Sequence, residues 1–188
     1  RKTSYTDQKA LVFSVFHKKS HENGSYEFYK DSGSLTLVPL KDKNKSAVVL
    51  MDKTKTIDYL SFLNKNIFNE ELKKRTNNLR GKLDLTSKLE SYIIKSHYIS
   101  KLYSHRIAFI GEAAHSMPPI GAQGLNTSFA DILELEKVFK NKENMTEITL
   151  CESNLKKYNR LRFPIVLSTI QAVNSLNWAS KSKIKIIQ

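Results

Sequence analysis

The first half of the chain alternates apolar and polar positions in the way that β-strands do. Residues 8–17, QKALVFSVFH, carry apolar side chains on both alternating faces, which predicts a strand covered on both sides. Three more strand-like runs follow, separated by short polar turns: YEFYK at 26–30, SLTLVPL at 34–40 and SAVVLMD at 46–52. Because short connections most simply join antiparallel neighbours, we expect one antiparallel sheet.

Beyond residue 55 the apolar spacing changes to threes and fours, which is typical of a helix. One apolar stripe runs through residues 56–78 and comprises Ile57, Leu60, Leu63, Ile67, Phe68 and, less regularly, Leu72. Residues 90–103, ESYIIKSHYISKLY, are rich in β-branched and aromatic side chains. They predict a long strand that returns to the sheet.

Two helices are predicted towards the C-terminus. Helical spacing covers residues 129–139 and then a region from about Thr146 to Trp178. Pro164 lies inside the second region and should kink or split it near Phe163, because proline lacks a backbone N–H. The pattern as a whole predicts an α+β fold with an antiparallel sheet and C-terminal helices.

Residues 106–132, RIAFIGEAAHSMPPIGAQGLNTSFADI, form the most constrained stretch of the chain. The apolar run 107–110 predicts a short buried strand that Gly111 ends, with the carboxylate of Glu112 at its carboxyl end. Pro118 and Pro119 then fix two φ angles and remove two N–H donors, so the segment is stiff.

The second half of that stretch is suited to holding a flat ligand. Gly121 and Gly124 allow the backbone to approach a ligand closely. A helix that begins near Leu125 points its unpaired N–H groups and its positive dipole end at the same place. These features suit a planar, electron-rich heterocycle that develops negative charge on its edge, such as a flavin.

The segment GEAAHSMPPIGAQGLN resembles the second flavin-binding motif of the FAD-dependent aromatic hydroxylases, which include para-hydroxybenzoate hydroxylase and the ubiquinone-biosynthesis hydroxylases. Their motif reads G-D-A-A-H, a few residues, P, then G-x-x-G-x-N. The resemblance implies that Glu112, longer than the usual aspartate, hydrogen-bonds the ribityl chain, and that backbone N–H groups of Leu125 and Asn126 meet the pyrimidine edge. The implied cofactor contacts are Gly111, Glu112, Pro119, Gly121, Ala122, Gln123, Gly124, Leu125 and Asn126, and the implied substrate contacts are Pro119 and Ile120.

The resemblance also implies an activity and a domain plan. The family inserts one oxygen atom of O₂ into an aromatic ring, with FAD as cofactor and NAD(P)H as transient reductant, so we assign no catalytic proton-transfer residue. It implies a substrate-domain sheet with a helical insertion at 1–103, and a FAD-binding segment with C-terminal helices at 104–188. Its Rossmann-type G-x-G-x-x-G turn does not occur among the six glycines, which predicts a fragment that lacks the dinucleotide-binding part.

The substrate class that we favour is a prenylated phenol in ubiquinone biosynthesis. The strand at 33–40 and the G-x-Q-G form around Gln123 resemble the ubiquinone branch. The alternatives are another flavoenzyme of the same fold, namely a small-aromatic hydroxylase, a halogenase or a dehydrogenase, and a non-catalytic basic interaction domain. Tyr158 and the arginines at 160–162 resemble residues of the family's C-terminal helices.

Charge and composition restrict the kinds of binding partner and site that this chain is expected to have. The net charge is +13, from 31 Lys and Arg against 18 Asp and Glu, but the lysines are scattered, which does not favour nucleic acid. Peripheral association with the inner membrane from the cytoplasm is compatible with this charge. The single Cys151 excludes an intrachain disulfide and fits a reducing compartment. His17 and His21 have no third ligand near in sequence, so we expect no metal site.

Overall fold

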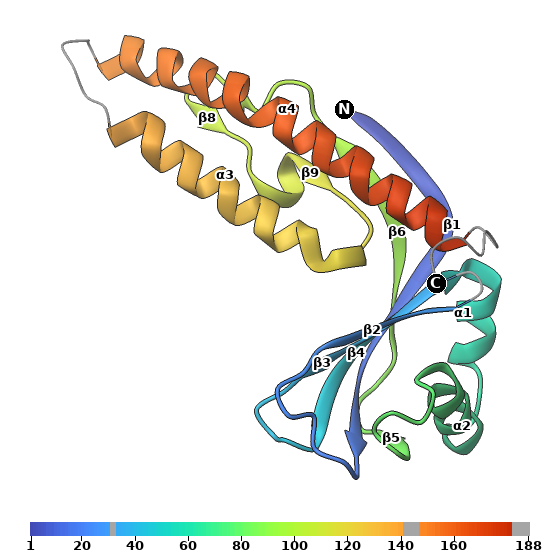
Figure 1. Ribbon diagram of the computed structural model, residues 1–188. Helices are drawn as coiled ribbons and strands as arrows, with labels where there is room; N and C mark the ends of the chain where they lie inside the picture. The colour runs from blue at the N-terminus through green and yellow to red at the C-terminus, as the bar shows by residue number, and fades with distance from the viewer. Residues whose placement is uncertain (31–32, 141–146, 182–188) are drawn as a thin grey trace. The chain divides into compact units, whose positions relative to one another are not determined.

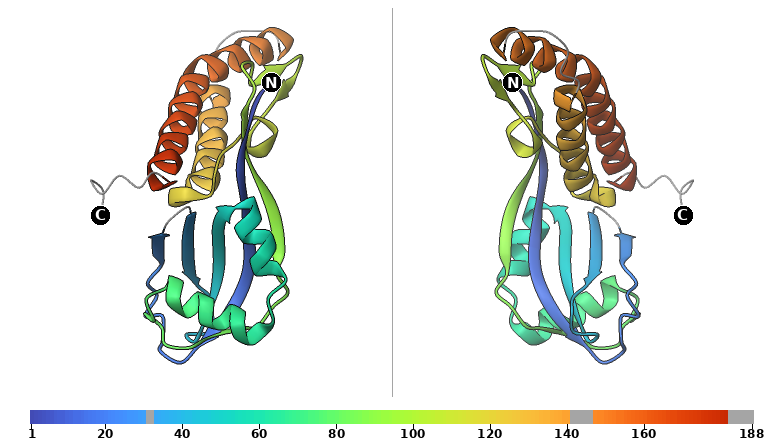
Figure 2. Two further views of the ribbon diagram at one scale, coloured as in Figure 1. Left: turned by 90° about the vertical axis from the view of Figure 1, so that its right-hand side faces the viewer. Right: turned by 90° about the vertical axis from the view of Figure 1, so that its left-hand side faces the viewer.

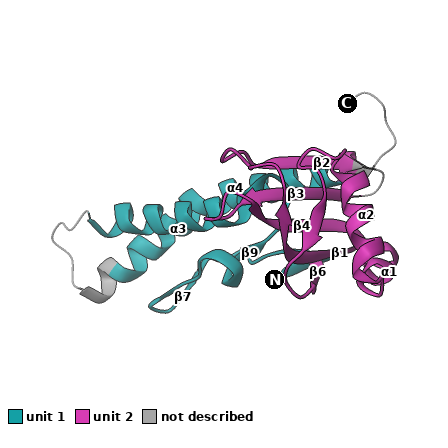
Figure 3. Cartoon of the chain, turned by 90° about the horizontal axis from the view of Figure 1, so that it is seen from below, with its two compact units in different colours: residues 1–6, 95–177 teal, residues 7–94, 178–188 magenta. Residues whose placement is uncertain are grey.

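The computed structural model describes residues 1–30, 33–140 and 147–181 (Figure 1). The chain forms two compact units, coloured separately in Figure 3. Unit 1 comprises Arg1–Thr6 and Lys95–Asn177, and unit 2 comprises Asp7–Ile94 and Trp178–Gln188. The predicted division into a substrate-domain sheet at 1–103 and a FAD-binding segment with C-terminal helices at 104–188 stays a prediction.

The predicted antiparallel sheet is confirmed. Its strands are β1 (Lys2–His17), β2 (Tyr26–Lys30), β3 (Gly33–Pro39), β4 (Lys45–Lys53), β5 (Leu83–Leu85), β6 (Glu90–Tyr98) and β9 (His115–Ser116). The strand order is β2-β3-β4-β1-β6-β9, and β5 also pairs with β1. The pairs β2–β3, β3–β4 and β1–β4 are all antiparallel. The long strand expected at 90–103 ends earlier, at Tyr98, and β6 lies beside β1 in the sheet.

One face of the sheet carries the core of unit 2. Leu11, Phe13 and Val15 of β1 pack with side chains of β3 and β4 and with helices α1 (Thr54–Ser61) and α2 (Lys65–Arg75). The prediction that β1 is covered on both sides is only partly correct. On the opposite face Ala10 is buried, but Val12 is half-buried and Phe16 is exposed, because α1 and α2 cover only the first face.

The apolar stripe at 56–78 belongs to two helices, where the spacing predicted one. The break falls at residues 62–64, where the side chain of Asn64 accepts a hydrogen bond from the Ile67 N–H at 3.0 Å and caps α2. This restart changes the helical phase, so Ile67 is exposed while Phe68 and Leu72 are buried.

The short strand predicted at 107–110 exists, but the prediction that it is buried is wrong. β8 (Ile107–Ala108) pairs only with β7 (Tyr103–Ser104) in a two-stranded sheet. No third strand pairs with this hairpin among the described residues, and Ile107 is 52% exposed and Ile110 37% exposed, whereas Phe109 packs against the core around Leu102 and Tyr158.

Two long helices complete unit 1. α3 (Gln123–Lys140) and α4 (Glu147–Lys181) lie side by side (Figures 1 and 2), and a second core forms around Leu102, Ala114, Val138 and Tyr158. α4 continues through Pro164 without splitting, although Figure 2 shows it curving. The predicted start at Thr146 lies outside the described residues. None of the described helices is long and apolar enough to cross a bilayer.

Candidate functional site

The predicted site residues lie on one continuous segment, residues 111–126, which follows β8 and includes the first four residues of α3; we call it the turn. It contains two short 3₁₀ turns, η1 (Gly111–Ala113) and η2 (Ile120–Ala122), with β9 between them. β9 anchors the turn to the main sheet, pairing His115 and Ser116 with Tyr98 and His97 of β6. α3 begins at Gln123, two residues before the predicted start, because η2 leads directly into it.

Backbone conformations in this turn are those that glycine permits. Gly111 and Gly121 have φ angles of 54° and 66°, in the left-handed region that other residues adopt at a cost. Ala122 has φ 51° and is therefore strained. The side chain of Gln123 donates to the carbonyl of Gly121 at 2.9 Å, and that of Asn126 donates to the carbonyl of Ala122 at 3.2 Å. These bonds hold the left-handed turn against the start of α3.

Most of the predicted cofactor residues are exposed. The exposed ones are Glu112, Pro119, Gly121, Ala122, Gly124, Leu125 and Asn126, while Gly111 and Gln123 are half-buried. Ile120 differs, since its side chain is fully buried. The turn points this side chain inward, so Ile120 offers a substrate only its backbone.

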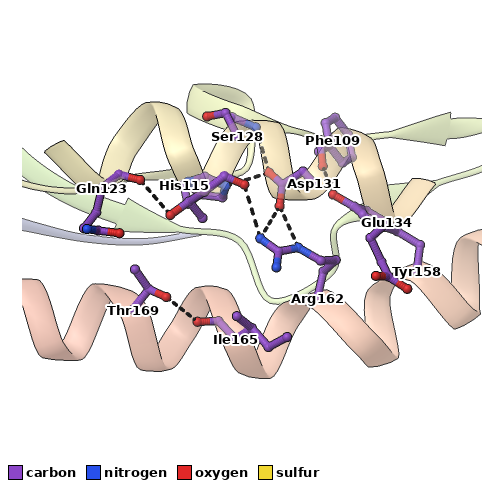
Figure 4. Close-up of polar contacts among 12 residues, drawn as sticks. Phe109, His115, Gln123, Ser128, Asp131, Glu134, Tyr158, Arg162, Ile165 and Thr169 are labelled. Carbon is purple, nitrogen blue, oxygen red and sulfur yellow. Dashed lines mark hydrogen bonds and ion pairs between the residues drawn. The ribbon is translucent and has the colours of Figure 1, made fainter. Parts of the chain in front are cut away.

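A buried carboxylate, that of Asp131 on α3, holds the turn in place (Figure 4). One of its oxygens accepts from Nε2 of His115 at 2.7 Å and from the Gly111 N–H at 3.1 Å. The other accepts from Nε and Nη2 of Arg162 on α4 at 2.9 and 2.8 Å. Nη2 of Arg162 also donates to the carbonyl of Thr127 at 3.2 Å. We call Asp131, His115 and Arg162 the buried clamp.

The clamp is charged. Burial by itself raises the pKa of Asp131, but the hydrogen bonds from His115, Arg162 and the Gly111 N–H outweigh burial, so this pKa lies below its ordinary value. Asp131 is therefore ionised at neutral pH and only accepts hydrogen bonds, which makes Nε2 of His115 a donor. The clamp thus ties η1 and β9 to both long helices by charge-assisted bonds.

Two further contacts fix the ends of η1. Tyr158 of α4 is fully buried and donates its hydroxyl to the carbonyl of Phe109 at 3.1 Å, and burial raises the pKa of that hydroxyl. His97 of β6 is buried and contacts the carbonyl of Glu112 through Nε2 at 2.9 Å. His97 therefore supports the backbone next to the predicted ribityl contact.

The sequence reasoning did not assign a role to the clamp. His115 stands inside the motif and Arg162 among the noted arginines, but Asp131 reads as an ordinary polar position of an amphipathic helix. The available signal was spacing. Residues 127, 131 and 138 are four and seven positions apart, so in a helix they share one face, and all three are buried in the structure. A buried carboxylate requires partners, and two of them, His115 and the Gly111 N–H, belong to the same stretch, 106–132, while Arg162 comes from α4.

His17 and His21, the pair considered for a metal, have their ring nitrogens in hydrogen bonds with protein atoms. His17 contacts the carbonyl of Lys19 at 2.7 Å and the hydroxyl of Ser46 at 3.0 Å. His21 contacts the carbonyl of Leu40 at 3.0 Å and the N–H of Asn23 at 3.0 Å. Both rings join the loops at one end of unit 2.

The donor set of the turn fits the pyrimidine and ribityl parts of a flavin. Because α3 begins at Gln123, the N–H groups of its first three residues have no partner within the helix, and two of these residues, Gly124 and Leu125, are exposed. A Cβ built on Gly124 meets no heavy atom within 4 Å, so the backbone is open to a flat ligand there. The carboxylate of Glu112 has no hydrogen-bond or ion-pair partner among the described residues, and it is free to accept bonds from hydroxyl groups.

Comparison with known proteins shows which family the chain resembles. A family model described as FAD binding domain matches residues 3–172. Ubiquinone hydroxylase UbiL of Rhodospirillum rubrum is 25% identical over 169 residues, which cover 90% of this chain and 39% of the relative. Ubiquinone hydroxylase UbiM of Neisseria meningitidis is 25% identical over 149 residues, which cover 79% of this chain and 32% of that relative. The chain thus spans less than half the length of these relatives.

Solved structures share the fold. PqsL of Pseudomonas aeruginosa in complex with 2-aminobenzoylacetate matches with a TM-score of 0.78 at 14% identity, over 97% of this chain and 50% of that one. HpxO of Klebsiella pneumoniae complexed with FAD and uric acid matches with a TM-score of 0.71 at 16% identity, over 97% of this chain and 47% of that one. The predicted fold class and the predicted family are therefore confirmed, and this chain belongs to the FAD binding domain family, with ubiquinone hydroxylases among its relatives.

Proposed function

We propose that this chain is the flavin-contacting and substrate-sheet part of an FAD-dependent aromatic hydroxylase. The observation that supports it best is the exposed turn from Gly111 to Asn126. The buried clamp fixes this turn through the hydrogen bonds that Asp131 accepts from the Gly111 N–H and from His115. Glu112 would bind the ribityl hydroxyls, and the N–H groups of Leu125 and Asn126 would bind the pyrimidine edge. The bound flavin would supply oxygen activation after reduction by NAD(P)H.

The chain's own contribution is orientation and charge. The positive end of α3 favours negative charge on a ring edge placed beside it. Pro119 and the backbone of Ile120 would face the substrate. The remaining predicted contacts at Gly111, Gly121, Ala122, Gln123 and Gly124 shape the close backbone approach.

The substrate that we propose is a prenylated phenol on the route to ubiquinone. The two ubiquinone hydroxylases among the relatives support this class. The net charge of +13 supports peripheral association with the cytoplasmic face of an anionic inner membrane. The fold does not separate hydroxylation from halogenation, since the halogenase CmlS is also similar, with a TM-score of 0.68. Oxygen in the product distinguishes the two.

Deleting the gene in its host tests this function. We expect an under-hydroxylated prenyl phenol to accumulate and the quinone pool to fall, because the oxygen-inserting step is missing. Mass spectrometry of extracted quinones measures both. The matched control restores the gene on a plasmid, which should return the normal pool. A normal quinone pool in the deletion strain, without such an intermediate, would contradict the proposal.

Replacing Glu112 with alanine tests the ribityl contact. In the full-length protein we expect FAD binding to weaken by roughly 1.5–3 kcal/mol, the usual worth of a hydrogen bond to a charged group. The fold should be unaffected, because the Glu112 carboxylate is exposed and unpaired among the described residues. Fluorescence titration of the apoprotein with FAD measures the affinity. Glu136→Ala, at an exposed site of α3, is the control, and equal FAD affinity in both variants would remove Glu112 from the site.

A further inference from the structure

An unpaired carboxylate oxygen lies on the edge strand of the unit 2 sheet. Oε1 of Glu27, on β2, is buried and accepts no hydrogen bond from any described residue. A buried charged oxygen without a donor is costly, and native structures keep such groups mainly where a ligand, water or ion binds. Oε1 of Glu27 therefore needs a donor that the described residues do not supply.

Tyr29 holds the Glu27 carboxylate from two residues along the strand. Its hydroxyl hydrogen-bonds to Glu27. Burial, the charge of Glu27 and this bond raise the pKa of Tyr29 to about 12, so the hydroxyl stays protonated and donates. The carboxylate is thereby oriented, while Oε1 remains available.

Both side chains lie on the sheet face opposite α1 and α2. Phe28, between them, packs against the core beneath those helices, so Glu27 and Tyr29 point to the other face. The strand register continues this face in two rows: Glu27, Thr36, Val49 and Val12, then Tyr29, Ser34, Met51 and Ala10.

These rows change from polar to apolar across the sheet. Glu27, Thr36 and Tyr29 stand at the β2 and β3 side, and half-buried Val49 and Val12 follow on β4 and β1. A ligand that matches this face has one hydroxyl donor and an apolar body. A phenol with a hydrocarbon tail has that composition.

We propose that Glu27, oriented by Tyr29, accepts the hydrogen bond of the substrate's phenol hydroxyl and so positions its ring. The proposal rests on the proposed function, because it takes the phenol as substrate. Thr36, Val49 and Val12 then form the floor beneath the ring and the start of its tail. Glu27 acts here through binding and takes no proton.

The chain contains a matched pair without this environment. On β6, Tyr92 donates to Oε2 of Glu90 at 2.6 Å with the same two-residue spacing. The two tyrosines are similarly exposed, Tyr29 at 45% and Tyr92 at 51%, but Glu90 is exposed whereas Oε1 of Glu27 is buried. Water therefore reaches the Glu90 carboxylate, and no ligand is needed there. Replacing Glu90 therefore serves as the control, because it also removes a glutamate from a strand and breaks its hydrogen bond with a tyrosine.

The test uses the FAD-loaded full-length protein with Glu27→Met and with Glu90→Met. Calorimetry measures binding of 2-prenylphenol and of its methyl ether, which lacks the donor. We expect Glu27→Met to weaken binding of the phenol by roughly tenfold to 150-fold, the worth of a hydrogen bond to a charged group, and to leave binding of the ether unchanged. Glu90→Met should change neither. Glu27→Gln, which keeps a neutral acceptor, should lie between wild type and Glu27→Met.

Stability separates this role from a structural one. Replacing the half-buried Glu27, whose Oε1 is buried without a donor, with an apolar side chain of similar shape should leave the denaturation midpoint unchanged or raise it. Two results would overturn the inference: a wild-type protein that binds phenol and ether equally, or Glu27→Met that binds phenol as tightly as wild type. If the wild type retains FAD but binds neither compound, the proposed substrate class fails as well.

Discussion

Replacing Asp131 with alanine is expected to remove about 3–5 kcal/mol from the free energy of unfolding, the usual cost of breaking a buried ion pair. The variant leaves the buried guanidinium of Arg162 without its counter-charge, and His115 and the Gly111 N–H without their acceptor. Denaturant titration of the full-length protein, followed by circular dichroism, measures the change.

Glu136→Ala is the matched control for that experiment. Glu136 lies on the same helix and pairs with Lys140 at 2.6 Å, but both side chains are exposed. Exposed pairs contribute little, so this variant should change the unfolding free energy by less than about 1 kcal/mol. Equal effects of the two variants would show that the clamp is not a stabilising unit.

The contribution of Asp131 depends on pH with a definite sign. Its pKa is lower in the folded state than in the unfolded chain. The clamp's stabilisation is therefore fully present above the unfolded value of about 3.9, and it is lost as pH falls through the folded pKa. The difference in unfolding free energy between wild type and Asp131→Ala should accordingly become smaller as the pH falls below about 3.9.

The strands and the family were predictable because their signals are local. Alternation in 8–17 and 34–40 marks residues that share a sheet face, and short polar links restrict the pairing to antiparallel neighbours. The motif from Gly111 to Asn126 is equally local, since a tight turn and a helix start need particular residues at fixed spacing. The exposed turn matches that expectation.

Burial depends on which elements meet, which sequence spacing does not specify. Ile107 and Ile110 have the composition of a buried strand, yet β8 pairs only with β7 among the described residues. Asp131, His115 and Arg162 come from a helix, a strand and a second helix, and only packing brings them within hydrogen-bond distance. Glu27 likewise becomes notable only because one of its oxygens is buried without a donor.

Gly124→Val should prevent the close approach of a flavin while leaving the chain folded. Gly124 is helical, and a Cβ there meets no heavy atom within 4 Å, so the protein itself has room for the side chain. Replacing a helical glycine should cost nothing, and alanine at this position should stabilise the helix by about 0.5–1 kcal/mol. If the flavin lies against this backbone, the valine methyl groups occupy its place.

FAD affinity of Gly124→Val is thus the most direct measurement of whether the flavin lies on the turn from Gly111 to Asn126. Titration of the full-length apoprotein with FAD should give binding weaker by roughly fivefold to 150-fold, corresponding to an overpacking cost of about 1–3 kcal/mol, with Gly124→Ala intermediate. Glu136→Val places the same side chain at an exposed position of the same helix and should bind FAD normally. A folded Gly124→Val variant that binds FAD as tightly as wild type would contradict the assignment of this turn as the flavin site.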